Sequence, residues 1–526
     1  MKRKSLVIGA SGLAIAVVGT GLWLEQLAAD PDGPKDCGDI LPPLAPLRPH
    51  AAAATAAEPR WAQKGGTVND ASCLDRTSVA GIVAPRSERE VADTLAYARA
   101  SGLTISPAGV RHSMGGQAFR RGGIMLDMRH LNRIELHPET STITVGGGAT
   151  WHDIQKAIHP RFAVKAMQST DIFSVGGSIS VNAHGMDHQA GAVMDSIRSL
   201  QLMLTDGRIL TVSPTENADL FNLVVGGYGL FGVILSAELE VVPNDIYASE
   251  RQLVATRDLP ARLEQILADR SIGLMYTHLS TAPGSLLDEA LVYSYRKANP
   301  PGAVPAPLGE VGSVKMRRLT VNLAKKGKLF QSLKWWSEKN LEHRFESCTV
   351  TRAQAMHDGE ACLVSRNDPM HDSVPYLRNA MEGDTDILHE YFIPRDRLLP
   401  FIDGLRDIVR RDDANLLNAS VRVVGQEHNM LTYAPAPAYS VVLYFNQSTD
   451  GDGNARMMRL TRDLIDLTHA NGGRFFLPYQ LHYSPDQLQR SYPQIREFFA
   501  AKQKWDPDGL LRNTWYDRYA PLLAAG

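Results

Sequence analysis

A run of small residues around one histidine, from Pro107 to Gln117, constrains this chain more than any other feature. It reads Pro-Ala-Gly-Val-Arg-His-Ser-Met-Gly-Gly-Gln and follows a short β-like run at residues 103–105. Small residues let backbone N–H groups approach a diphosphate closely, and turns of this kind form concave anion-binding sites. The run therefore predicts a phosphate-binding loop, and the simpler alternative for His112 is a side chain that only caps a turn.

A second segment rich in small residues extends from Met167 to Gly185. Its Gly176 and Gly177 permit close backbone approach to a ligand. Residues 193–210 then predict a hairpin, because Thr-Asp-Gly separates two apolar runs, and a third glycine-rich run covers residues 226–234. Ordered motifs spread over about 150 residues are specific, whereas a single glycine-rich loop would be a weak signal.

In order and spacing, these motifs resemble the FAD-binding domain of the vanillyl-alcohol oxidase / p-cresol methylhydroxylase superfamily. The Gly-x-Arg-His-Ser-x-x-Gly-Gln pattern is similar to diphosphate loops of cytokinin dehydrogenases and of alditol and aldonolactone oxidases, in which the matching histidine carries 8α-linked FAD. The resemblance implies a flavoprotein with FAD bound covalently through His112. No cysteine lies between Met167 and Gly177, where doubly linked members attach the flavin again, so one covalent bond is expected.

The resemblance also implies which residues surround the FAD. They come from the diphosphate loop, from the second and third glycine-rich segments, and from a closing segment at residues 498–513, whose last residue has turn capping as its alternative role. The predicted cofactor-binding residues are Ala108, Gly109, Val110, Arg111, His112, Ser113, Gln117, Thr170, Asp171, Ser174, Gly176, Gly177, Ser180, His184, Gly185, Val233, Ile234 and Asn513.

The length of 526 residues exceeds that of one ordinary domain, and 44% apolar residues suffice for large cores. The expected fold is α+β, with a two-part FAD-binding domain and a cap whose antiparallel sheet is flanked by helices. The expected divisions are an N-terminal anchor or signal segment (1–29), a Pro/Ala-rich linker (30–75), the FAD-binding domain (76–245), the cap or substrate domain (246–485) and a C-terminal segment that returns to the FAD-binding domain (486–526).

Charge and cysteine content narrow the possible partners. With 55 basic and 57 acidic residues, the net charge of −2 argues against a nucleic-acid partner. The four cysteines show no metal-ligand spacing, so no metal is expected. Cys348 and Cys362 could pair in an oxidising compartment, and unpaired buried thiols are the alternative.

The N-terminus carries Lys2-Arg3-Lys4 before an uncharged run from Ser5 to Leu24, which is long enough to cross a bilayer once. Positive charge before the span predicts a cytoplasmic N-terminus with the body outside the cytoplasm, on the periplasmic side. A cleaved signal peptide that exports the protein is the rival interpretation. The favoured prediction is a membrane anchor.

Several elements of the cap follow from apolar patterns. Residues 388–394 and 441–445 predict strands, residues 472–482 predict a strand that returns toward the flavin, and residues 329–343 predict an amphipathic helix. That helix contains Trp335 and Trp336, for which core packing is the commoner fate and contact with a membrane surface the alternative.

Flavin-dependent oxidation of an alcohol needs a base for the hydroxyl proton and a positive or hydrogen-bonding group for developing negative charge. Arg422 is the predicted cation, since its strand-like segment resembles the Glu-aliphatic-Arg segment of alditol and aldonolactone oxidases. Ser420 stands where those enzymes have the Glu, which weakens the case for a polyol-oxidase mechanism. Glu427 and His428 follow as candidate acid–base groups, with solvated loop positions as the alternative.

The segment that returns toward the flavin often ends in lysine or histidine in the superfamily, and this chain has no lysine there. Tyr479 and His482 are therefore the remaining predicted catalytic residues. Together these residues predict an FAD-linked oxidoreductase that takes a hydride from a small alcohol, sugar lactone or amine and passes electrons to oxygen or another acceptor. The alternatives are a flavoenzyme acting on a lipid-linked sugar or sterol, and a non-catalytic flavin-holding electron-transfer subunit.

Overall fold

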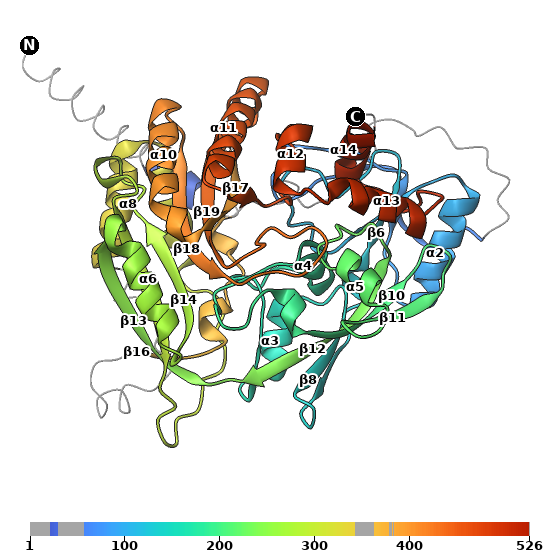
Figure 1. The fold of residues 1–526 in the computed structure, drawn as a ribbon, viewed down its shortest axis with the longest axis horizontal. Helices are drawn as coiled ribbons and strands as arrows, with labels where there is room; N and C mark the ends of the chain where they lie inside the picture. Colours follow the sequence, from blue (N-terminus) through green and yellow to red (C-terminus); the bar gives the residue numbers. More distant parts are fainter. Residues whose placement is uncertain (1–20, 30–56, 342–361, 378–380, 382, 525–526) are drawn as a thin grey trace, which may run out of the picture.

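The structure is a computed structural model that describes residues 21–29, 57–341, 362–377, 381 and 383–524. Two sheet-containing halves lie side by side, with strands β1 to β12 in one and β13 to β20 in the other (Figure 1). Every strand pair of the second half is antiparallel. The predicted α+β class, with an antiparallel sheet in the cap, is confirmed.

A four-stranded sheet with the order β1-β4-β6-β5 forms the first part of the predicted FAD-binding domain. Helix α2 (Glu88–Ala100) connects β4 to β5, and its apolar residues, among them Val91 and Leu95, are buried against this sheet. The Ser87 hydroxyl accepts a hydrogen bond from the backbone N–H of Glu90, which fixes the start of the helix. The strands are β1 (Trp61–Lys64), β4 (Gly81–Val83), β5 (Ile105–Ala108) and β6 (Ile124–Asp127), next to a two-stranded ribbon of β2 (Thr67–Val68) and β3 (Thr77–Ser78).

A second sheet, with the order β11-β10-β12-β8-β7 and β9 paired to β12, completes this domain. Helices α3 (Trp151–Ile158), α4 (Val175–Val181) and α5 (Ala218–Val224) pack on it through buried apolar residues. The strands are β7 (Ile134–His137), β8 (Thr142–Gly146), β9 (Phe162–Val164), β10 (Ile197–Met203), β11 (Ile209–Val212) and β12 (Val233–Pro243).

The cap is built on an eight-stranded sheet with the order β16-β13-β15-β14-β18-β19-β17-β20. Helices α6 (Leu259–Ala268), α10 (Leu398–Arg411) and α11 (Gly451–Ala470) bury their apolar faces in the core of this half. The strands are β13 (Ile246–Ala255), β14 (Ile272–Leu279), β15 (Glu289–Lys297), β16 (Cys362–Ser365), β17 (Asp384–Pro394), β18 (Leu416–Val424), β19 (Ala438–Ser448) and β20 (Arg474–Phe475).

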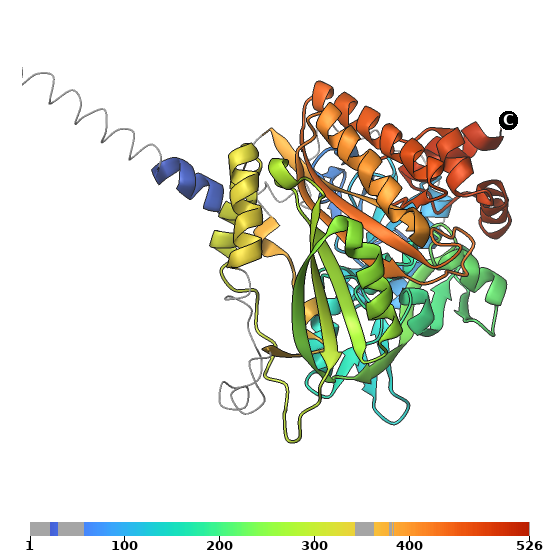
Figure 2. The same cartoon turned by 60° about the vertical axis from the view of Figure 1, so that its left-hand side comes forward.

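Two helices, α7 (Val314–Ala324) and α8 (Lys328–Asn340), form a hairpin at one side of the cap, and the helix at residues 21–28 lies against it (Figure 2). Asn322 Nδ2 on α7 donates a hydrogen bond to the carbonyl oxygen of Leu27 at 2.8 Å, and Leu27 itself is buried. Within the described residues, no helix combines the length and the apolar composition needed to cross a membrane. Most of the uncharged run from Ser5 to Leu24 lies outside them.

The strand predicted at residues 472–482 is wrong in extent, because only β20 is extended there. β20 pairs on one side with β17, through Phe475 opposite Tyr391 and Arg474 opposite Phe392. Pro478, which lacks a backbone N–H, cannot continue a ladder of hydrogen bonds, and the chain proceeds as a loop to α12 (Pro485–Ser491).

Two of the four cysteines lie within the described residues, and both form disulfides. Cys362 is disulfide-bonded, and so is Cys73, for which no partner was predicted. Cys37 and Cys348 lie outside the described residues.

The C-terminal segment lies against the predicted FAD-binding domain. After α13 (Ile495–Trp505), Leu511 forms a parallel bridge with Ile105 of β5, and α14 (Thr514–Ala524) follows. The Asp506 carboxylate accepts hydrogen bonds from the backbone N–H groups of Leu510 and Leu511, at 2.9 and 2.8 Å, and pairs with the ammonium of Lys502. Both charged side chains are 1% exposed. This buried ion pair fixes the turn that joins the C-terminal segment to β5.

We predict that Asp506→Ala lowers the free energy of unfolding by about 3–5 kcal/mol, because it leaves the Lys502 ammonium buried without a counter-charge. Asp508→Ala is the matched control: its ion pair with Arg99 is exposed and should contribute less than about 1 kcal/mol. Thermal or denaturant unfolding of the two variants measures the difference. Equal destabilisation by both substitutions would contradict the role assigned to Asp506.

Candidate active site

A cavity of about 1540 Å³ lies between the predicted FAD-binding domain and the cap. Its walls come from the loop at residues 106–114, from the second and third glycine-rich segments, and from one face of the cap sheet. The loops that resemble the FAD-binding motifs thus share one cavity with strands of the cap.

Most of the predicted cofactor-binding residues line this cavity. Asp171 and Gly185 are the two that do not. The residues that do are Ala108, Gly109, Val110, Arg111, His112, Ser113, Gln117, Thr170, Ser174, Gly176, Gly177, Ser180, His184, Val233, Ile234 and Asn513.

The glycines of this wall are required by close backbone approach. A Cβ atom on Gly109 would lie 1.9 Å from the Ser174 hydroxyl oxygen, and one on Gly176 would lie 2.8 Å from the carbonyl oxygen of Gly147. Gly109 therefore lets the diphosphate loop pack directly on the Ser174 side chain, and Gly176 lets the second segment approach the backbone of Gly147. A wall of this kind, with the His112 ring edge-to-face against Phe173 at 5.0 Å, fits a flavin dinucleotide.

Two predicted cofactor contacts also have structural roles. Gln117 Nε2 donates to the carbonyl oxygen of Pro478 at 2.7 Å, which ties the diphosphate loop to the loop after β20. The Asn513 side-chain oxygen accepts from the backbone N–H of Tyr516 at 2.9 Å, at the start of α14. Asn513 thus fulfils the capping alternative and lines the cavity as well.

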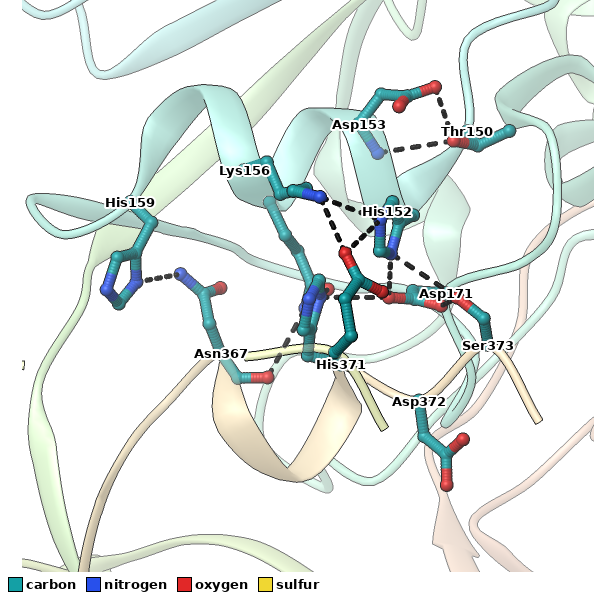
Figure 3. A network of polar contacts seen from close by, with 12 residues as sticks. Thr150, His152, Asp153, Lys156, His159, Asp171, Asn367, His371, Asp372 and Ser373 are labelled. Atoms are coloured by element: carbon teal, nitrogen blue, oxygen red, sulfur yellow. Dashed lines mark hydrogen bonds and ion pairs between the residues drawn. The ribbon is translucent and has the colours of Figure 1, made fainter. Parts of the chain in front are cut away.

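Asp171 belongs to a buried network of polar side chains instead of the cavity wall (Figure 3). The Nδ1 atoms of His152 and His371 each lie 2.9 Å from Asp171 Oδ2, and the Ser373 hydroxyl donates to Oδ1 at 2.7 Å. Burial alone would raise the pKa of Asp171, but hydrogen bonds from His371, Ser373 and His152 outweigh it and lower the pKa. These side chains could hold a metal ion, with ligand atoms within 4.8 Å of one another, although the distances between them are those of hydrogen bonds. We interpret the network as a clamp between α3 and the segment that contains His371.

The register of the cap sheet determines which of its side chains reach the cavity. His278, Ser420, Val442 and Glu390 occupy one row across β14, β18, β19 and β17, and all four line the cavity. Since side chains alternate along a strand, Arg422 lies on the same face as Ser420 and also lines the cavity. The predicted cation therefore shares the cavity with Glu390, a residue that sequence reasoning missed.

Glu390 is the centre of the polar groups on this face. Its Oε1 accepts hydrogen bonds from His184 Nε2 and from the Ser440 hydroxyl, each at 2.6 Å, and its Oε2 accepts from the Tyr479 hydroxyl at 3.1 Å. Burial would raise the pKa of Glu390, but the charges of His184 and Arg422 and the hydrogen bonds lower it overall. Glu390 is therefore a buried carboxylate that stays ionised at neutral pH.

Tyr479 and Arg422 complete this cluster. Burial and the adjacent Glu390 carboxylate raise the pKa of Tyr479 well above 10, so its hydroxyl remains a hydrogen-bond donor. Burial lowers the pKa of Arg422, opposed mainly by the charge of Glu390. Arg422 Nε has no hydrogen-bond partner among the described residues. Because Arg422 lines the cavity, its guanidinium is available to a ligand there.

Three other candidates lie elsewhere. His482 is not among the residues that line the cavity: its Nε2 lies 3.1 Å from Asn454 Oδ1 on α11, and burial lowers its pKa to about 4. Glu427 is also outside this cavity, where it accepts hydrogen bonds from Asn182 Nδ2 and from the backbone N–H groups of Tyr433 and Ala434, and burial raises its pKa to about 8. His428 is exposed, in agreement with its solvated alternative.

Comparison with known proteins agrees with this geometry. A family described as FAD binding domain matches residues 79–213. Decaprenylphosphoryl-β-D-ribose oxidase of Mycolicibacterium smegmatis is 23% identical over 428 residues, which cover 78% of this chain and 88% of that relative. Cytokinin dehydrogenase 3 of Oryza sativa subsp. japonica is 30% identical over 172 residues, which cover 31% of this chain and 33% of that relative.

The fold and the site therefore define an FAD-binding oxidoreductase. Residues 79–213 match an FAD binding domain, and the similarity to an oxidase and to a cytokinin dehydrogenase agrees with the resemblance to FAD-linked oxidoreductases of the vanillyl-alcohol oxidase / p-cresol methylhydroxylase superfamily. The cofactor predicted from the diphosphate loop is FAD, and the described residues that line the cavity fit it.

We predict that Asp171→Asn leaves the FAD content unchanged but lowers the free energy of unfolding at neutral pH by roughly 1.5–3 kcal/mol, because it weakens charge-assisted hydrogen bonds. The pKa of Asp171 is lowered in the folded state, so its contribution is present above the ordinary value of 3.8 and is lost as pH falls through the folded value. The difference from wild type should therefore shrink in acid. Asp153→Asn, at an exposed position of α3, is the control, and loss of flavin absorbance in Asp171→Asn would contradict this assignment.

Proposed function

We propose that this FAD-dependent oxidoreductase oxidises a CH–OH group of a sugar-like alcohol that carries an apolar chain. The observation that carries the proposal is the convergence of Glu390, Tyr479 and Arg422 on the cavity that the FAD-binding loops share. A non-catalytic electron-transfer subunit has no need for such a cluster on its cap. Enzymatic oxidation is therefore favoured over that alternative.

FAD, when bound, would supply the acceptor for the hydride of the substrate carbon. The hydroxyl proton needs an acceptor, and Glu390 provides one through the Tyr479 hydroxyl: Tyr479 takes the substrate proton while its own proton moves to the carboxylate at 3.1 Å. The hydroxyl carbon thereby becomes a carbonyl. Arg422 stabilises the negative charge that develops on the substrate oxygen or on the reduced flavin.

An alcohol suits this cluster better than an amine does. A protonated amine would have to enter beside Arg422, and like charges in a buried site repel one another. A hydroxyl group can instead accept from the guanidinium and donate to Tyr479.

The apolar chain is inferred from a second part of the cavity. Beyond the polar cluster, the cavity extends to a wall from α7, α8, β16 and the segment after β16, which mixes apolar side chains with charged ones such as Arg317, Lys334 and Glu338. The apolar part of this wall comprises Met316, Val321, Ala324, Leu341, Val364 and Leu377. An enzyme for a small alcohol has no use for this extension, whereas decaprenylphosphoryl-β-D-ribose, the compound after which one relative is named, combines a sugar with a long hydrocarbon.

We also place the body of the protein outside the cytoplasm, held by the uncharged run from Ser5 to Leu24. The disulfide-bonded Cys73 and Cys362 support this location, because disulfides persist in oxidising compartments. The electron acceptor is oxygen or a membrane-soluble carrier.

We predict that Arg422→Met slows flavin reduction by on the order of a hundredfold to a thousandfold while FAD stays bound, since a preorganised donor of this kind contributes roughly 3–4 kcal/mol. Arg422→Lys should recover little, because lysine lacks the paired planar donors. Anaerobic stopped-flow bleaching of the flavin measures the rate, with short-chain prenylphosphoryl pentoses, alcohols, aldonolactones and amines as substrates. Arg459→Met, at an exposed position of α11, is the control.

Glu390→Gln should slow the same step, and its pH dependence identifies the base. Because the pKa of Glu390 is lowered, the wild-type rate should hold as pH falls to the ordinary glutamate range and decrease only below it. Rates within threefold of wild type for both Arg422→Met and Glu390→Gln would remove this cluster from the reaction.

We further predict that FAD is attached to His112. Acid precipitation should leave flavin fluorescence on the polypeptide, and His112→Ala should release it, because no other imidazole stands at the matching place in the diphosphate loop. His130→Ala, at an exposed position after β6, should keep the flavin attached. Free FAD in the supernatant of precipitated wild-type protein would disprove covalency but not FAD binding.

A further inference from the structure

Helix α8 exposes a stripe of large apolar side chains. Leu329, Leu333 and Trp336 are 69%, 51% and 53% exposed and are spaced at i, i+4 and i+7, which places them on one face of the helix. The neighbouring Trp335 points the other way: it is buried and donates to Glu289 Oε2 at 2.8 Å. Core packing thus accounts for one tryptophan of the pair and leaves Trp336 unexplained.

The stripe is part of a larger apolar surface. Six of the ten large apolar residues that the described chain exposes belong to α7, α8 and the helix at residues 21–28. They are Leu22, Trp23, Met316, Leu329, Leu333 and Trp336. Scattered apolar residues need no explanation, but a concentration on adjacent helices marks an interaction surface.

The same helices are strongly basic. Residues 314–340 contain eight lysines and arginines and one acidic residue, Glu338. Lys315, Arg317, Lys326 and Lys328 are exposed on these two helices or on the turn between them. Arg317, Lys326 and Lys328 also lie within 4.0 Å of the carboxylates of Asp372, Asp384 and Asp413, so the aspartates offset part of this positive charge. Apolar side chains bordered by cations on a helix favour an anionic bilayer surface over a neutral protein partner.

The uncharged N-terminal run arrives at this surface. Its last residues belong to the helix at residues 21–28, which α7 holds through Asn322 and through Arg318, whose Nη1 donates to the carbonyl oxygen of Ala28 at 3.3 Å. A run that enters a bilayer from this position would bring α7 and α8 to the membrane surface.

The cavity opens at the same place. Met316 is 64% exposed and also lines the cavity, so it marks a mouth, and Thr320 of α7 and Ser337 of α8 continue the wall inward. We propose that the surface formed by α7, α8 and residues 21–28 docks on an anionic bilayer and takes a lipid-linked substrate from it directly into the cavity. The delivery step rests on the proposed function, whereas the docking does not.

Bromine quenching of tryptophan in the full-length holoenzyme tests the docking. The protein is reconstituted into vesicles of phosphatidylcholine and phosphatidylglycerol with brominated acyl chains, and wild type is compared with Trp336→Phe. Trp23 and Trp336 are the exposed tryptophans of the described chain, so the quenched emission should fall by about half in the variant if both reach the interface. Trp61→Phe, in β1 of the FAD-binding domain, should leave the quenched emission unchanged.

Leu329→Gln/Leu333→Gln should reduce the quenching of Trp336, since both exposed leucines can be replaced without disturbing the core. With vesicles of phosphatidylcholine alone, the quenching should be weaker and should no longer depend on the salt concentration. Equal quenching in wild type and Trp336→Phe would overturn the proposal, as would a dimer that shields Trp336 in detergent. Because no turnover is measured, either result leaves the effects of Arg422→Met and Glu390→Gln on flavin reduction as a separate test of the proposed function.

Discussion

The buried carboxylate of Glu390 is the interaction on which the site depends. It lies on β17 of the cap, yet one of its closest partners is His184, which follows α4 of the FAD-binding domain. A buried carboxylate is costly unless it is paired and hydrogen-bonded, and here His184, Ser440 and Tyr479 supply the bonds while Arg422 supplies positive charge. Satisfying this one charge therefore requires the cap strands, the second FAD segment and the loop after β20 to meet at the same point.

That requirement explains how a site can form from segments far apart in the chain. The Gln117 amide ties the diphosphate loop to Pro478, next to Tyr479, and Asp506 fixes the turn after which Leu511 pairs with β5. Each contact joins a loop of the FAD-binding domain to a segment that comes hundreds of residues later. The strands of the cap sheet position Glu390, Arg422 and Ser440, and these contacts bring Tyr479 and the loops of the FAD-binding domain to them.

From the sequence we could predict most of the residues that line the cavity on the side of the FAD-binding loops, and Arg422 and Tyr479 but not Glu390 on the side of the cap. Glycine-rich loops can be recognised from the sequence because their role is local. Gly109 and Gly176 are needed because the chain packs closely there, and this need depends little on distant residues. Glu390 could not be assigned in this way, because its role depends on the register that places it in one row with Ser420. A signal was present: an acidic residue inside the apolar run 388–394 has to be buried and paired. His482 does not line the cavity, since a loop replaces the predicted strand and the ring lies against Asn454 of α11.

The position at which alditol and aldonolactone oxidases usually have a glutamate connects these findings. Ser420 stands where the resemblance to alditol and aldonolactone oxidases expects an acid, and Glu390 lies in the same row of the sheet, two strands away across β19. A carboxylate on this face can therefore come from a different strand while Arg422 keeps its place. Such a shift moves the carboxylate across the cavity relative to the guanidinium, and it therefore changes the shape of the ligand that fits between them. In the function and the docking that we propose, the cavity wall from α7 and α8 belongs to the substrate site, and the outer surface of the same helices is its entrance.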